Sequence, residues 1–165
     1  MKKLILSITV LFLSIAAFAQ QYDTTPPYLR TKYIPNFVLL SLDSVPFTQS
    51  VLVSGKKTII MLFNPECEHC QHQLESMLTI MDVLDSVNII LTSTETLGKI
   101  KIFYDKYHLE KYPMIHIGKD FKYFFTGYYQ PRTVPDLAFY NKERHLLYFN
   151  MGGLKPKEII NVLNN

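Results

Sequence analysis

The sequence predicts an α/β fold with a mixed central sheet and helices on both faces. Short apolar runs rich in β-branched residues alternate with segments whose apolar side chains recur every three or four positions, the spacings of buried strands and amphipathic helices. Near the C-terminus two strand-like runs are joined by a short polar turn and followed by one more helical pattern, which predicts an antiparallel hairpin and a last helix. These patterns together are typical of α/β domains.

The first elements are short. Residues 20–34 include Pro26-Pro27 and several polar side chains, so we expect an extended and partly disordered lead-in to a domain at 35–165. Strands are expected at 36–40 and 47–51, with a turn between them.

A central strand and a helix are the clearest elements. Residues 58–63 are almost wholly apolar and β-branched, as in a strand covered on both faces. Asn64 and Pro65 then suit the N-cap and the first position of a helix. One face of that helix would carry Cys67, Cys70, Leu74, Met77, Met81 and Leu84.

The remaining segments continue the alternation. A short aromatic helix broken at Gly127 is expected within residues 121–129, and the final hairpin turns at residues 141–143. Strands are expected at 88–92, 113–117, 134–140 and 144–149, and the other helices at 96–107 and 156–163.

The N-terminus has the pattern of a signal peptide. Two lysines precede an apolar run of about fifteen residues, short of the roughly 20 that span a bilayer, and Ala17-Phe18-Ala19 fits a cleavage site after Ala19. We therefore expect residues 1–19 to be removed and the protein to be exported to the periplasm; an uncleaved membrane anchor is the alternative. Without Lys2 and Lys3 the remaining basic residues nearly balance the 14 acidic ones, which gives no support for a nucleic-acid partner.

Both cysteines of the chain, Cys67 and Cys70, lie at the strand–helix junction. A helix N-terminus favours an anion, and His69 between the cysteines also favours the thiolate of Cys67. Glu66 and Glu68 oppose this by repulsion. In helical geometry Cys67 would be the exposed attacking sulfur, and Cys70, one turn further on, would resolve the mixed disulfide.

Other roles for the motif stay open. A structural disulfide here would close a very short loop and constrain the unfolded chain little. A copper or zinc site could use Cys67, Cys70 and one or both of His69 and His72, because thiolate and imidazole ligands suit these ions; zinc sites, however, usually draw on two separated pairs of ligands. We favour redox chemistry, with no metal bound.

The strand ending in Cys-x-x-Cys, the following βα units and the Thr133-Val134-Pro135 step before a hairpin resemble the thioredoxin superfamily. The resemblance is to its exported TlpA- and ResA-like redoxin branch, and it covers roughly residues 35–165. It implies that Cys67 is the nucleophile, that Cys70 resolves, and that Pro135 is a cis-proline facing them. Thr133 and Val134 would bind the partner. It further implies a thiol–disulfide oxidoreductase with protein disulfide or thiol substrates, a membrane or exported redox partner, and no cofactor beyond its own Cys67–Cys70 disulfide.

The chain also departs from that pattern. Glu66 replaces the usual tryptophan, and Met61 replaces the buried aspartate of thioredoxin, whose role Glu75 or His72 would have to take. Glu68 is typical of ResA-like reductases whereas His69 is typical of oxidants; we favour the reductase direction.

Two further alternatives follow from the same resemblance. A thiol peroxidase of the redoxin type usually has threonine where this chain has Asn64. An inactive interaction module could use the aromatic residues 121–125 for docking, although core packing explains such residues more often.

Overall fold

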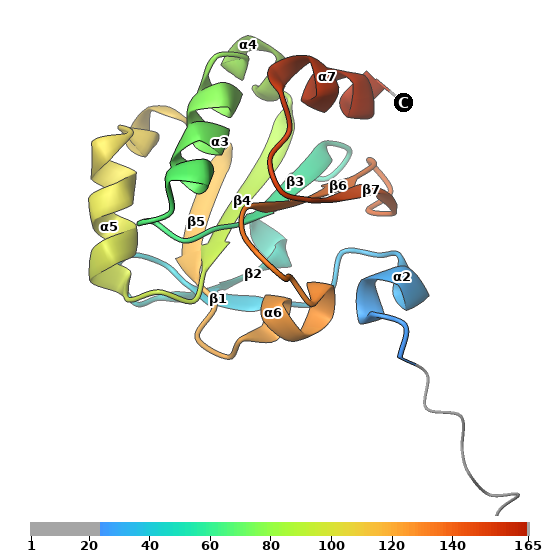
Figure 1. Ribbon diagram of the computed structural model, residues 1–165, viewed down its shortest axis with the longest axis horizontal. Helices are drawn as coiled ribbons and strands as arrows, with labels where there is room; N and C mark the ends of the chain where they lie inside the picture. Colours follow the sequence, from blue (N-terminus) through green and yellow to red (C-terminus); the bar gives the residue numbers. More distant parts are fainter. Residues whose placement is uncertain (1–23, 165) are drawn as a thin grey trace, which may run out of the picture.

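The computed structural model describes residues 24–164, so the predicted signal peptide lies outside the described residues. Seven strands form one mixed sheet in the order β2-β1-β5-β4-β3-β6-β7 (Figure 1). The three inner strands β3, β4 and β5 run parallel, and β1, β6 and β7 are antiparallel to their neighbours. The strands are β1 (Val38–Leu40), β2 (Pro46–Thr48), β3 (Lys57–Leu62), β4 (Val87–Ser93), β5 (Ile115–Lys119), β6 (Asp136–Tyr140) and β7 (Leu146–Met151).

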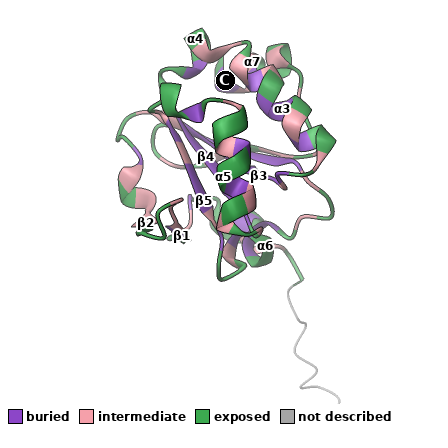
Figure 2. Ribbon diagram, turned by 90° about the vertical axis from the view of Figure 1, so that its left-hand side faces the viewer, coloured by how far each residue is buried: buried purple, intermediate pink, exposed green. Residues whose placement is uncertain are grey.

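Helices cover both faces of the sheet, as predicted. One face packs against α3 (Glu68–Leu78), α4 (Met81–Leu84), α5 (Leu97–Lys106) and α7 (Pro156–Asn164). The other face is covered by α2 (Pro27–Thr31) and α6 (Phe124–Tyr129) (Figure 1). Figure 2 shows the buried residues concentrated in the strands and on the inner sides of the helices. No helix within residues 24–164 is both long enough and apolar enough to cross a bilayer.

The register of the inner strands brings three chain segments together. Leu62, the last residue of β3, pairs with Thr92 on one side and with Asp136 on the other. The loop that follows β3 therefore leaves the sheet between the end of β4 and the start of β6. This meeting point holds the cysteine motif and the Thr133-Val134-Pro135 step, which lie far apart in the sequence.

The lead-in differs from the prediction. Residues 27–31 form helix α2 with Pro27 at its start, where the missing N–H of proline costs nothing. The helix is held by aromatic packing, since the ring of Tyr28 contacts the rings of Tyr129 and Phe149 at centroid distances of 5.7 and 4.5 Å. This packing involves residues about a hundred positions away, which local sequence patterns do not reveal.

Three other elements also differ from the expected ones. The predicted break at Gly127 is wrong: α6 runs through it, and the carboxylate of Asp120 accepts hydrogen bonds from the first amides of that helix, those of Phe124 and Phe125. The predicted strand at 47–51 becomes a 3-10 turn from Gln49 onward. The long apolar stripe ending at Leu84 is divided between α3 and α4.

Candidate redox site

A tight turn presents the first cysteine. The amide of Glu66 donates to Asn64 Oδ1 at 2.8 Å, and the amide of Cys67 donates to the Asn64 carbonyl at 3.1 Å. Helix α3 begins at Glu68 with Cys67 as its N-cap. The predicted helix start at Asn64 and Pro65 is therefore wrong by three residues, because the Asn64 side chain closes the turn before the helix instead of capping the helix.

Cys67 lies half-buried at the N-terminus of α3. Its sulfur is 3.7 Å from the carbonyl oxygen of Val134, so the cysteine faces the segment before β6. The unpaired amides of the first helical turn favour negative charge at this place. Cys67 is thus a partly exposed residue that the fold orients towards Val134.

The acidic residue before Cys67 is neutralised by a lysine. Lys99 Nζ lies 2.6 Å from Glu66 Oε2 and 3.2 Å from Glu95 Oε2. Hydrogen bonding to Glu66, and then to Glu95, raises the pKa of Lys99. The repulsion that Glu66 was expected to exert on a Cys67 thiolate is therefore partly offset by a neighbouring cation.

Cys70 lies one helical turn further on and is fully buried. The amide of Asn64 donates to its sulfur at 3.5 Å. Burial raises the pKa of the Cys70 thiol to about 12, with smaller contributions in the same direction from Cys67 and Asp136. At neutral pH Cys70 is therefore a thiol, and it must lose a proton before it can attack.

This pKa predicts a pH dependence of stability in the reduced protein. The unfolded thiol ionises near pH 8.5, so the folded state holds the proton more tightly; the contribution is complete below that pH and is lost as the pH rises towards 12. Between pH 7 and 10 we expect the free energy of unfolding to fall by about 1.5–2 kcal/mol more in the wild type than in Cys70→Ala. Urea unfolding under reducing conditions measures this, and parallel curves would contradict it.

The segment opposite Cys67 has the expected backbone. The Val134–Pro135 peptide bond is cis, and Pro135 is buried whereas Thr133 is exposed. An open groove of about 750 Å³ runs beside this segment. Its walls come from α3, from the segment before β6 and from the connection between β7 and α7; they include His69, Thr133, Val134, Pro135, Gly152 and Lys155.

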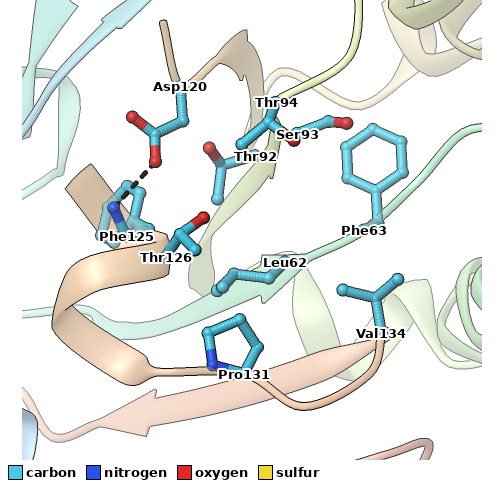
Figure 3. Close-up of a pocket in the computed structure, with 10 residues that line it drawn as sticks. All are labelled: Leu62, Phe63, Thr92, Ser93, Thr94, Asp120, Phe125, Thr126, Pro131 and Val134. Atoms are coloured by element: carbon cyan, nitrogen blue, oxygen red, sulfur yellow. Dashed lines mark hydrogen bonds between the residues drawn. The ribbon is translucent and has the colours of Figure 1, made fainter. Parts of the chain in front are cut away.

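A second, smaller hollow lies on the other side of Val134. This cavity has a volume of about 60 Å³. Figure 3 shows Val134, Phe63 and Pro131 among the residues that line it. The buried hydroxyl of Thr92 has no hydrogen-bond partner among residues 24–164. Val134 borders both hollows.

Two residues considered for proton transfer lie away from the buried thiol. His72 Nδ1 is 3.1 Å from Glu75 Oε2 on the exposed side of α3, and Tyr107 also donates to Glu75. These hydrogen bonds, that to His72 first, lower the pKa of Glu75. Within residues 24–164 no group of three or more histidine, cysteine or acidic side chains is arranged to hold a metal ion.

Two buried polar residues next to site residues are not among those that the sequence predicts for the site. Asp136 is fully buried at the start of β6, directly after Pro135, and Gln73 is buried in α3 one turn after Cys70. The sequence predicts Asp136 only as part of the strand at 134–140. A carboxylate within an otherwise apolar run is unusual, and that signal was present in the sequence.

Comparison with solved structures confirms a thioredoxin-like fold. A secreted disulfide oxidoreductase of Mycobacterium tuberculosis, homologous to E. coli DsbE, is 20% identical with a TM-score of 0.64, over 78% of this chain and 94% of that one. StoA from Bacillus subtilis is 16% identical with a TM-score of 0.60, over 78% and 96%.

A thiol peroxidase from Chromobacterium violaceum also shares the fold, at 13% identity with a TM-score of 0.66, over 80% of this chain and 83% of that one. No protein-family model matches the sequence, and no curated protein matches it. At these identities the likeness concerns the fold.

Proposed function

We propose that this protein is an exported thiol–disulfide oxidoreductase that works as a reductase. One observation carries the proposal: a half-buried Cys67 at a helix N-terminus faces Val134 beside an open groove, with a buried Cys70 one turn behind it. This arrangement separates an attacking sulfur from a sulfur that only its neighbour can reach. The oxidoreductase named among the similar structures supports the proposal.

The reaction is an exchange of sulfur–sulfur bonds. The Cys67 thiolate attacks one sulfur of a partner disulfide, and the other sulfur leaves as a thiolate. Cys70 then loses its proton and attacks the Cys67 sulfur of the mixed disulfide. A Cys67–Cys70 disulfide forms, the partner leaves with two thiols, and two electrons have passed to it. An exported or membrane reductant restores the dithiol; no other cofactor is required.

The groove and the cis-proline segment would bind the partner. An extended chain beside Cys67 could pair with the backbone of Thr133 and Val134, as extended peptides do when they add to exposed strands. Exposed His69 lies at the groove wall. The substrates are therefore protein disulfides.

Direction and export rest on separate observations. Glu68 within the motif favours a reductase, because ResA-like reductases carry glutamate there. The signal-like N-terminus favours export, in agreement with the secreted protein among the similar structures. Disulfide exchange outside the cytoplasm also suits a protein whose two cysteines are both in the motif.

Two measurements test the proposal. The wild type should reduce the disulfides of insulin with dithiothreitol as electron donor, and titration of the Cys67–Cys70 couple against glutathione should give a potential below that of glutathione. A potential well above it would reverse the proposed direction. If the folded, fully reduced protein does not reduce insulin, the proposed function is wrong.

A further inference from the structure

A buried hydroxyl without a partner lies at the smaller hollow that Val134 borders. Thr92 of β4 lines this hollow and is 2% exposed, and its Oγ1 has no hydrogen-bond partner within the described part of the chain. Buried polar groups are normally paired, because an unpaired one is costly. A hydroxyl both donates and accepts a hydrogen bond, so Thr92 is suited to a ligand that enters the hollow.

The hollow has a buried floor and an exposed rim. Leu62 and Phe125 line it and are buried, whereas Thr94 and Thr126 line it and are exposed. A single water molecule needs about 10–15 Å³ of such space. The cavity of about 60 Å³ therefore accommodates a short side chain and not an aromatic ring.

The walls also restrict the chemistry of a ligand. Asp120 lines the hollow, and its two carboxylate oxygens accept from the amides of Phe124 and Phe125 at 2.9 and 2.8 Å; Figure 3 shows the second bond. A buried carboxylate disfavours an acidic ligand, because like charges repel. The walls therefore favour a short, neutral side chain that can hydrogen-bond to Thr92.

The hollow and Cys67 lie towards opposite faces of the sheet. Cys67 packs against the core on the α3 face, whereas Leu62 and Phe125 belong to the core on the α6 face. Thr92 follows Ile90 of the α6-face core by two positions in β4, so the two side chains point the same way. The unpaired hydroxyl is thus on the side of the sheet away from Cys67.

Val134 connects these two places. Its side chain packs against both cores, and its carbonyl oxygen is 3.7 Å from the Cys67 sulfur. Successive side chains of an extended chain point to opposite faces. If a partner's cysteine points towards Cys67 from a chain lying along Val134, the residues on either side of that cysteine point towards the hollow.

We propose that this hollow binds the side chain next to the partner's reacting cysteine, and that Thr92 selects a short neutral side chain with a hydroxyl, such as serine. The inference rests on the proposed function and defines its substrates more closely. The preferred disulfides are those with serine or threonine beside the cysteine that Cys67 attacks.

Peptides of the form Gly-Gly-X-Cys-X-Gly-Gly test this, with serine, alanine or aspartate at both X positions. Each carries nitrothiobenzoate on its cysteine as a mixed disulfide. The Cys67 thiolate of the reduced protein attacks the peptide sulfur and forms a protein–peptide disulfide, and nitrothiobenzoate leaves as a coloured thiolate. Stopped-flow absorbance gives the rate constant. The rate of each peptide with mercaptoethanol normalises for the peptide's own reactivity, and the rate of each protein with dithionitrobenzoate normalises for that of Cys67.

The wild type should react with the serine peptide about fivefold faster than with the alanine peptide, the usual effect of one hydrogen bond, and most slowly with the aspartate peptide. In Thr92→Val, which keeps the shape but lacks the hydroxyl, the ratio of serine to alanine rates should fall to about one. Thr92→Ser should retain the preference. Equal serine and alanine rates in the wild type, or a preference that survives in Thr92→Val, would overturn the proposal.

Thr58→Val is the matched control. Thr58 is 1% exposed near the start of β3, away from the hollow, and its Oγ1 accepts from Asn88 Nδ2 at 3.4 Å. Its ratio of serine to alanine rates should match that of the wild type, and loss of the preference here would contradict a specific role for Thr92. A wild type that reacts with every peptide no faster than mercaptoethanol does would instead refute the proposed function.

Discussion

Cys67→Ser is expected to abolish disulfide exchange, with the rate of insulin reduction falling by a factor on the order of 10³ or more, as in other enzymes that lose their nucleophile. A serine hydroxyl does not ionise near neutral pH, and buried Cys70 is not exposed to a partner. Cys70→Ser should also stop turnover, but at a later step. Its Cys67 can still attack a partner, and the mixed disulfide then persists because no second thiol resolves it.

Non-reducing gels and mass spectrometry of each variant after incubation with oxidised substrate distinguish these outcomes. A covalent adduct on Cys67 should accumulate with Cys70→Ser and should be missing with Cys67→Ser. Circular dichroism confirms that both variants are folded. Equal trapping by the two variants, or trapping by neither, would remove the assignment of attacking and resolving roles.

Phe139→Ala should lower the free energy of unfolding by about 3–5 kcal/mol, the usual cost of deleting a buried aromatic ring. Phe139 lies on strand β6, between β3 and β7, and has no exposed surface; it pairs with Ile59 of β3. Its ring packs in the core that also contains Leu74 and Met77 of α3. Removing the Phe139 ring would therefore weaken the packing of α3, the helix that begins at the cysteine pair.

Tyr148→Ala is a suitable control, because Tyr148 pairs with Phe139 across β6 and β7 but its side chain is 43% exposed. We expect its cost to stay below about 1 kcal/mol, as is usual for surface positions. Urea unfolding with the cysteines reduced measures both variants. If Phe139→Ala and Tyr148→Ala lower the free energy of unfolding by similar amounts, burial of the Phe139 ring is not what stabilises β6.

Much of the fold could be predicted because its strongest signals are local. The apolar run at residues 58–63 and the turn at 141–143 indicate a buried strand and a hairpin whatever surrounds them, and both are present. Helix α2 could not be predicted in this way. Its proline pair indicates extended chain, and contacts of Tyr28 with distant rings override that preference.

The residues of the candidate site also divide into those with local sequence signals and those placed by contacts between distant residues. The cysteine pair and the cis-proline follow from motif and resemblance, since each is defined by neighbouring residues. Asp136 and Gln73 are buried and accept hydrogen bonds from the amides of Gly152 and Leu154. Neither residue belongs to a recognisable motif. The register of β3 and β6 sets Leu62 beside Asp136, and local sequence patterns do not reveal this pairing.

The strand-like contact made by the segment before β1 bears on how the domain can be shortened. The Ile34 amide donates to the Arg144 carbonyl at 3.0 Å, and the Leu146 amide donates to the Lys32 carbonyl at 2.7 Å. These bonds cover one end of the outermost strand, β7. A chain truncated to begin at residue 35 would leave that backbone uncovered, as a template for edge-to-edge association with a second molecule.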